Sequence, residues 1–250
     1  MGDGGQIPEE WGDDPLSEHI AVACNKARVS FVQRPSQYKL THDVDAVYRD
    51  VLGRAEELSN TEAWMAPLFI HGSHASFLAS VQLALAGQLP QSFMVQRGTL
   101  EYALYGFYLA ADEKRQETWL NRHKSAEHLK AVKQEFRPST FLSLVTKCDS
   151  KIGVRCKELY ELAIDHGAHP NSRGVIQVLT EERTESTRRI GADYFSHEHP
   201  FFENCLRCTV GIGITSMRVF GLLWPEQFEG WGTFEELSRL DTVCYGAEEA

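Results

Sequence analysis

Hydrophobic side chains recur at helical spacing along most of the 250-residue chain. Over residues 37–60 they form one stripe on an otherwise polar segment, made of Val44, Val47, Val51, Ala55 and Leu58. The spacing is clearest in the next segment, where related turns carry Trp64, Leu68, His71, Ala75, Leu78 and Leu85. Apolar positions three and four apart indicate one face of an amphipathic helix. We therefore expect a polar helix over 37–60 and then a buried core helix that ends near Gly87.

A third segment, from Pro90 to about Ala111, is apolar on nearly all sides. Pro90 suits the first turn of a helix, where the missing N–H of proline costs no hydrogen bond. A helix that is hydrophobic all round is usually buried. We therefore expect this helix to be central in a bundle.

The rest of the chain predicts further helices and one departure from helical structure. A more polar helix is expected over 113–136 and should end at the Arg137-Pro138 step, because the residue before proline avoids the helical region. Shorter helices are expected at 138–147, 151–165, 200–223 and 233–241. From Gly174 to Phe195, β-branched and apolar residues flank a polar stretch, which indicates a β-hairpin or a long excursion. The predicted fold class is all-α: a helical bundle of five to seven helices, with a small non-helical or β-hairpin excursion near 174–196.

Composition fits one helical domain over 16–250, preceded by an acidic flexible tail over 1–15. Hydrophobic residues make up 42% and charged residues 24% of the chain, so a sizeable core can form. The first eighteen residues hold six Asp or Glu and no Lys or Arg, the opposite of a secretory n-region. Polar residues interrupt the apolar stretch 63–111, so we expect no membrane-spanning helix. We therefore expect a cytoplasmic protein whose six cysteines are reduced.

Arg97 and Glu101 are the only formal charges between Ala63 and Ala111. They are four residues apart and therefore share a helix face. A buried charge without a partner costs several kcal/mol, so we expect the two to pair with each other or with polar groups of neighbouring helices. Two interpretations stay open: a structural ion pair that fixes helix register, or a site that lines a cleft between helices.

Residues 114–137 carry a net positive charge, whereas the chain as a whole is negative. They contain seven Lys or Arg and three Glu, a local charge of +4 in a chain of net charge −10, and they also hold His123 and His128. Net acidity disfavours nucleic-acid binding by the whole surface, because phosphate contacts need clustered Lys and Arg. This segment is either a solvated helix face or a surface for RNA or nucleotide phosphates. The second interpretation assigns RNA binding to Arg115, Lys124 and Lys130 of this segment, and also to Asn171 later in the chain.

Three stretches carry a resemblance to a known family: Arg97-Gly98-Thr99-Leu100-Glu101-Tyr102, Trp119-Leu120-Asn121-Arg122-His123 and Gly167-Ala168-His169-Pro170-Asn171. On these residues the chain resembles the HEPN-type helical bundles (higher eukaryotes and prokaryotes nucleotide-binding). It looks more similar still to uncharacterised bacterial helical proteins loosely related to them. The resemblance covers roughly residues 65–220.

The resemblance implies a metal-independent endoribonuclease without a cofactor, of the kind found in toxin–antitoxin or phage-defence systems. It also implies a homodimer, with the site formed across it, and an antitoxin-type protein partner. An Arg-x5-His spacing runs from Arg122 to His128. Carried over by position, Arg122 would stabilise the phosphate, His128 would act in proton transfer, and His123 would be the polar residue after the arginine. Cleavage by an RNA 2′-OH needs such a group that titrates near neutrality and a fixed cation at the phosphate.

Ten histidines offer a different chemistry. His71 and His74 share a helix face and could bind one metal ion. His197 and His199 shortly precede a Cys-x2-Cys spacing at Cys205 and Cys208, which superficially resembles a zinc-ligand set. The alternative is that these cysteines pack as small hydrophobic residues and the histidines serve as polar or capping groups.

The polar break from Asp165 to Asn171 is a further candidate, because loops on a rigid scaffold often carry site residues. It equally fits a helix stop in which His169 and Asn171 satisfy backbone groups.

Three functional hypotheses therefore stand side by side. The first is an RNA-directed protein that uses Arg97, Glu101, Arg122, His123, His128 and His169. The second is a non-catalytic helical interaction or structural protein in which these residues order the core and an interface. The third is a small His-rich metalloprotein.

Overall fold

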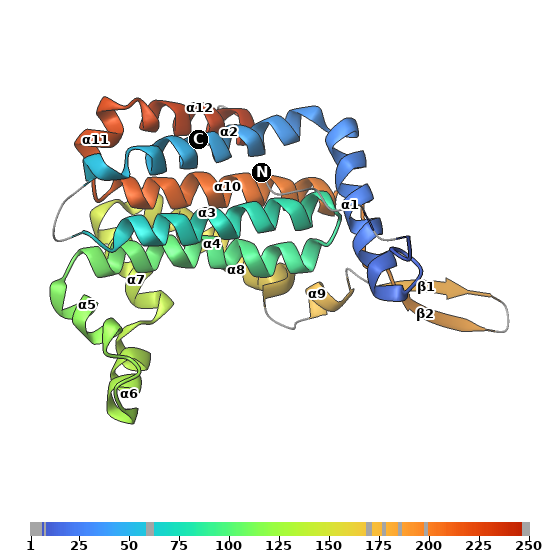
Figure 1. Cartoon of the computed structure of the whole chain (residues 1–250), viewed down its shortest axis with the longest axis horizontal. Helices are drawn as coiled ribbons and strands as arrows, with labels where there is room; N and C mark the ends of the chain where they lie inside the picture. Colours follow the sequence, from blue (N-terminus) through green and yellow to red (C-terminus); the bar gives the residue numbers. More distant parts are fainter. Residues whose placement is uncertain are drawn as a thin grey trace.

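A helical hairpin and one further long helix form the centre of the protein. The computed structural model describes residues 7, 9–58, 63–168, 172–176, 179–184, 187–197 and 200–246. Helix α3 (Ala66–Leu85) turns sharply into α4 (Leu89–Ala110), and α10 (Phe201–Gly221) packs against both. The three helices run side by side through the middle of Figure 1.

The outer helices cover this centre from different sides. Helices α2 (Pro35–Gly53) and α12 (Thr233–Tyr245) pack on each other and on α10. Helices α7 (Pro138–Cys148) and α8 (Ser150–Ala163) pair with each other and contact α4. Helix α1 (Pro15–Gln33) crosses one end of the bundle and contacts α3 (Figure 1).

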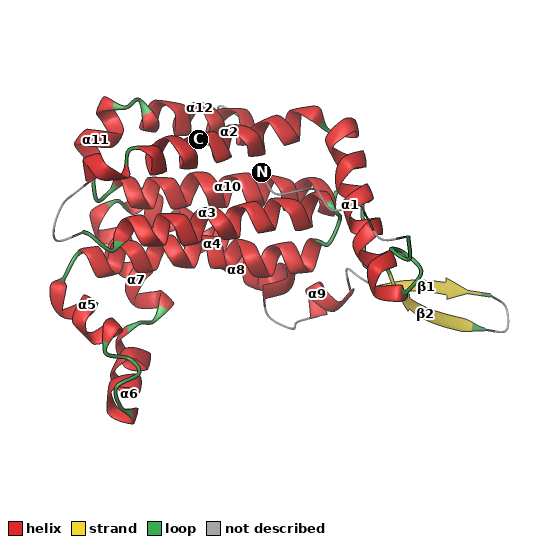
Figure 2. Cartoon of the chain, viewed as in Figure 1, coloured by secondary structure: helices red, strands yellow, loops and turns green. Residues whose placement is uncertain are grey.

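Short elements complete the chain. They are the 3₁₀ helix η1 (Ala55–Leu58), α5 (Glu113–Leu120), α6 (Ala126–Glu135), the π-helical turn η2 (Ile164–Ala168), α9 (Ser172–Ile176) and α11 (Pro225–Gly230). Strands β1 (Leu179–Arg183) and β2 (Arg188–Ala192) pair antiparallel, with Leu179 opposite Ala192 and Arg183 opposite Arg188. Figure 2 shows this small hairpin projecting from an otherwise helical molecule. The all-α fold class with a β-hairpin excursion is confirmed.

Large apolar side chains from α2, α3, α4 and α10 pack together and form the core. Tyr48, Phe77, Leu100, Leu104 and Phe220 are all less than 2% exposed. Gly213 on α10 lets two neighbours come close, because a Cβ there would lie 2.7 Å from Val44 Cγ1 and 2.9 Å from Phe77 Cε2. Burial of such side chains stabilises the fold by roughly 1.5–3 kcal/mol each.

One local prediction needs correction. The single helix expected over 113–136 is broken, because α5 ends at Leu120 and α6 begins at Ala126. Ser125 causes the restart: its side chain caps α6 by accepting a hydrogen bond from the His128 N–H, a role for which serine is preferred. Helix α1 is an addition, because no element was predicted between the tail over 1–15 and the helix over 37–60. It begins at Pro15 behind the capping side chain of Asp14, which accepts from the Leu16 and Ser17 N–H groups.

The hydrophobic stripe predicted on α3 mostly faces solvent, whereas we expected it to be buried. Trp64, Leu68 and Leu78 are 51%, 59% and 39% exposed, so most of the stripe with the clearest spacing faces outward. The inner face consists instead of Phe69, Ile70, Ser73, His74 and Phe77. Because α3 is apolar on both faces, periodicity alone could not select the buried one.

Candidate functional site

Arg97 and Glu101 form the predicted ion pair on α4. Arg97 Nε lies 2.8 Å from Glu101 Oε1. Tyr160 on α8 joins them, because its hydroxyl donates to the same oxygen at 2.9 Å and its ring lies 5.0 Å below the Arg97 guanidinium carbon. Burial, together with the neighbouring Glu101 carboxylate, raises the pKa of Tyr160 to about 12. The phenol therefore stays protonated and keeps donating at neutral pH.

The pair is less buried than the sequence suggested. The Arg97 and Glu101 side chains are 23% and 32% exposed, although α4 itself does lie at the centre of the bundle. One turn further along α4, Tyr105 is half-buried. Burial raises the pKa of Tyr105, with Glu101 acting in the same direction and Arg122 against it. A polar strip therefore runs along α4 from Arg97 through Glu101 and Tyr105 and comes within electrostatic reach of Arg122.

Arg122 belongs to an arm that stands away from the bundle. We call α5, the turn 121–125 and α6 the basic arm. Figure 1 shows α6 projecting beyond the packed helices. The arm is held at its base, where Trp119 packs edge-on to Phe69 at 5.7 Å between ring centroids. Arg115 is also part of this anchor, because it donates to the Tyr108 carbonyl at 3.2 Å and covers the Tyr108 ring at 4.0 Å.

The remaining cations of the basic arm face solvent. The turn presents Arg122, His123 and Lys124, and α6 presents His128 and Lys130, all exposed. Within the described part of the chain, Arg122, Lys124 and Lys130 have no ion-pair partner. These side chains are therefore available to an external anion.

His128 carries a defined hydrogen bond at the start of α6. The Ser125 hydroxyl lies 2.6 Å from Glu127 Oε2 and 2.9 Å from His128 Nδ1. The hydrogen bond from Ser125 holds the pKa of Glu127 below its usual value. Since the one hydroxyl proton goes to the Glu127 carboxylate, His128 Nδ1 must carry a proton to donate to Ser125. That tautomer leaves Nε2 as the nitrogen that accepts a proton.

The polar break after α8 is partly described. It forms the π-helical turn η2, in which Gly167 packs against the backbone of Pro90 and His166 stacks on Phe93 at 5.0 Å between ring centroids. His169 and Asn171 lie outside the described residues, so their assignments stay predictions.

The described histidines and cysteines are engaged in packing and hydrogen bonds. His74 bonds to Asp45 and is buried, whereas His71 on the same helix is exposed. His197 Nε2 lies 3.2 Å from the Leu85 carbonyl oxygen. Burial raises the pKa of both Cys205 and Cys208 to about 12, which keeps them as neutral thiols. In the described segments no three His, Cys, Asp or Glu side chains come together as a metal site would require.

The sequence did not predict a buried polar network that lies between α2, α3 and α4. The Tyr48 hydroxyl lies 2.9 Å from Ser73 Oγ, which donates to the Thr99 carbonyl at 3.0 Å. Next to it, His74 Nε2 lies 2.6 Å from Asp45 Oδ1. The missed signal was Tyr48 on an apolar stripe, since a buried tyrosine hydroxyl usually has a partner. This network joins three helices.

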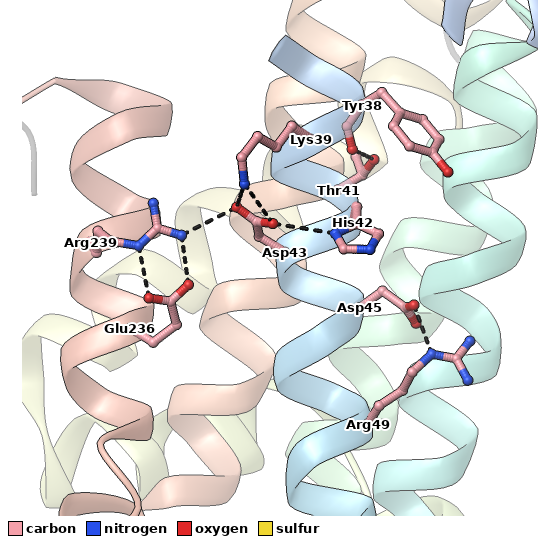
Figure 3. A network of polar contacts seen from close by, with 9 residues as sticks. All are labelled: Tyr38, Lys39, Thr41, His42, Asp43, Asp45, Arg49, Glu236 and Arg239. Carbon is pink, nitrogen blue, oxygen red and sulfur yellow. Dashed lines mark hydrogen bonds and ion pairs between the residues drawn. The ribbon is translucent and has the colours of Figure 1, made fainter. Parts of the chain in front are cut away.

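A second polar network lies on the surface between α2 and α12. Figure 3 shows Asp43 between Lys39 and Arg239, with Glu236 holding Arg239 from the other side. These residues line an open cavity of about 360 Å³, together with Trp231 and Thr233. Each cation there already faces a carboxylate, so the network ties α2 to α12 and leaves no uncompensated charge for a ligand.

Comparison of the chain with protein-family models, with curated proteins and with solved structures gave no match.

Proposed function

We propose that this protein is RNA-directed and that its basic arm is the surface that contacts RNA phosphates. The observation that carries the proposal is the exposure of Arg122, Lys124 and Lys130 on an arm that projects from a chain of net charge −10. Clustered cations without intramolecular carboxylate partners attract a polyanion, whereas the acidic remainder of the surface repels it.

The finer proposal is cleavage of RNA at the arm without a metal ion. His128 Nε2 would accept the proton of a ribose 2′-OH, while the Arg122 guanidinium would stabilise charge on the phosphate. The attacking 2′-oxygen would bond to phosphorus, and the 5′-oxygen of the next nucleotide would leave with a proton from His123 or from water. The Ser125–Glu127 hydrogen bond supports this role by fixing the His128 tautomer. A toxin or phage-defence role would follow from such an activity.

A non-catalytic interaction protein is the second candidate. It is favoured by the Arg97–Glu101–Tyr160 cluster, which links α4 to α8 through a shared oxygen as a structural ion pair would. The same residues fit the first candidate only if RNA extends from the arm along the polar strip of α4.

RNA binding can be tested by fluorescence anisotropy with a single-stranded RNA of mixed sequence at several salt concentrations. Each phosphate contact contributes about 0.7 to the slope of log K against log salt for single strands. The double variant Arg122→Ala/Lys124→Ala should therefore bind more weakly, with a slope reduced by about 1.4. The matched control is Lys151→Ala/Lys157→Ala on α8, which removes two exposed cations outside the arm and should keep the wild-type slope.

Cleavage is tested separately on the same RNA. His128→Ala should bind RNA like the wild type and lose cleavage, and expression of the wild type but not of Arg122→Ala should arrest growth. Binding without cleavage by the wild type would remove the nuclease and keep the RNA-binding protein. Absence of RNA binding, or an unchanged salt slope in the arm variant, would leave the interaction protein as the better account.

A further inference from the structure

The outer face of the α3–α4 hairpin exposes a row of apolar side chains that no described element covers. On α3 it presents Leu68, Ala75 and Leu78, with Trp64 just before the helix, and on α4 it presents Met94 and Tyr102. Their exposed fractions reach 59% for Leu68 and 49% for Met94. Large contiguous apolar patches on a protein surface usually mark an interaction site. We call this surface the hairpin face.

The spacing on the hairpin face is that of helix-to-helix packing. The positions 64, 68, 71, 75 and 78 alternate steps of four and three, an average repeat of 3.5 residues. Gln91, Met94, Gly98 and Tyr102 continue the pattern on α4. A 3.5-residue repeat keeps one seam of a helix turned towards a partner helix. The described residues include no helix packed on this seam, because the opposite face of α3 packs on the core.

The hairpin face has projecting side chains and a recessed surface beside them. The Tyr102 ring crosses Gly72, where a Cβ would lie 2.5 Å from Tyr102 Cε1. One turn away, a Cβ on Gly98 would have only Ser76 Oγ nearby, at 3.9 Å, so the surface between Met94 and Tyr102 is recessed. An isologous interface needs both shapes on one patch, since each copy inserts its projections into the other.

Charge favours a second copy of this chain as the partner. Residues 63–96 contain no Lys, Arg, Asp or Glu, whereas the whole chain has a net charge of −10. Two copies would repel each other through most of their surfaces, and the hairpin face brings no like charges together. A charged partner of either sign would gain nothing from contact with this face.

The size of the hairpin face lies at the lower end of the range for stable interfaces. Helix α3 has 20 residues and is therefore about 30 Å long. Two adjacent helices give a strip about 20 Å wide, or about 600 Å² in projection. Stable interfaces bury roughly 600–1,000 Å² on each partner, so a strip of this size is just large enough for one.

We propose that two copies of this chain associate through their hairpin faces, so that four helices, α3 and α4 from each copy, pack into one symmetric interface. The proposal is independent of RNA binding, because the cations of the basic arm are not part of the hairpin face. Helix α3 is also the one described helix with the length and composition of a membrane span, so a lipid surface is the competing occupant.

The test is the mass of the full-length protein by sedimentation equilibrium. The wild type should sediment at twice the 28.2 kDa of one chain, and Leu68→Glu/Met94→Glu should sediment as a single chain with unchanged helicity by circular dichroism. Both replaced side chains are exposed in the monomer, so the variant should still fold. The matched control is Val243→Glu on α12, at a position 57% exposed, which should remain a dimer.

A second measurement locates the interface directly. A photo-crosslinking amino acid at position 68 should yield a covalent dimer, and the same residue at position 243 should not. A monomeric wild type at tens of micromolar, a dimer that survives Leu68→Glu/Met94→Glu, or co-sedimentation with phosphatidylcholine vesicles in place of self-association would each overturn the proposal.

Discussion

The Tyr160 hydroxyl on α8 donates to Glu101 Oε1 on α4 at 2.9 Å, the oxygen that also accepts from Arg97 Nε. The bond connects two helices that are 59 residues apart in the sequence at these positions. A carboxylate oxygen that accepts two hydrogen bonds, one from a cation, holds both donors in place. The cluster therefore fixes the position of α8 against the central helix.

Tyr160→Phe should lower the free energy of unfolding by about 1 kcal/mol, because it removes a hydrogen bond to a charged but partly exposed acceptor. Urea denaturation measures the change. Ser143→Ala, an exposed hydroxyl on α7, serves as a control and should change stability by less than about 0.5 kcal/mol. If Tyr160→Phe leaves stability intact and weakens RNA binding, the cluster is part of a site and not a structural link.

Alkaline pH should weaken the same contact. The pKa of Tyr160 is raised from 10.0 to about 12, mainly by burial. The unfolded chain therefore releases the phenol proton at lower pH than the folded one. The stability that Tyr160 contributes is fully present below pH 10 and is lost as the pH rises through about 12. Urea titrations at pH values between these two should show that the free energy of unfolding falls more steeply with pH for the wild type than for Tyr160→Phe. Parallel pH dependences would contradict the assignment.

Asp45→Asn should remove part of the acid sensitivity of the fold. Burial opposes ionisation of Asp45, but hydrogen bonds from Arg49 and His74 outweigh it and lower the pKa of the carboxyl below 3.8. Its contribution is present above pH 3.8 and is lost as the pH falls through the folded-state pKa. We expect a loss of about 1–2 kcal/mol at neutral pH. Thermal denaturation at neutral and at acidic pH measures both effects. The control Asp50→Asn, at an exposed ion pair with Arg54, should change stability by less than about 0.5 kcal/mol.

Native thiol labelling should separate two exposed cysteines from three buried ones. Cys24 and Cys148 are exposed, whereas Cys156, Cys205 and Cys208 are buried, and burial raises the pKa of each of these three to about 12. The thiolate is the reactive form, so iodoacetamide should modify Cys24 and Cys148 first. Intact-mass and peptide mass spectrometry report the sites. Rapid modification of Cys205 or Cys208 in the folded protein would show that α10 is not buried.

Ser125→Ala should loosen the basic arm without unfolding the bundle. Ser125 caps α6, and loss of such a cap costs about 1 kcal/mol. Because α6 buries only Val132, the effect should be confined to the arm. Hydrogen exchange of the amides at 126–129 should accelerate several-fold, while those of α4 keep the wild-type rate. Ser238→Ala, inside α12, is the matched serine replacement that should leave α6 unchanged.

Much of the fold could be predicted because it depends on local patterns. Pro90 at the first turn and the apolar run behind it predicted α4 almost to the residue. The Arg137-Pro138 step placed the boundary between α6 and α7. The Arg97–Glu101 pair followed from a spacing of four on one helix. Tyr160, Tyr105 and the Asp45–His74 contact were not predictable in this way, since each depends on which helices become neighbours.

By itself the sequence determined that α3 is a helix, since its apolar positions recur at helical spacing and no charge interrupts them. Only the tertiary structure decided which side of that helix is buried. Phe69 and Phe77 fill the space beside α4 and α10, so Leu68 and Leu78 are left at the surface. Burial of either apolar side of α3 would stabilise the fold. The closely packed interior of one chain can accommodate only one of them.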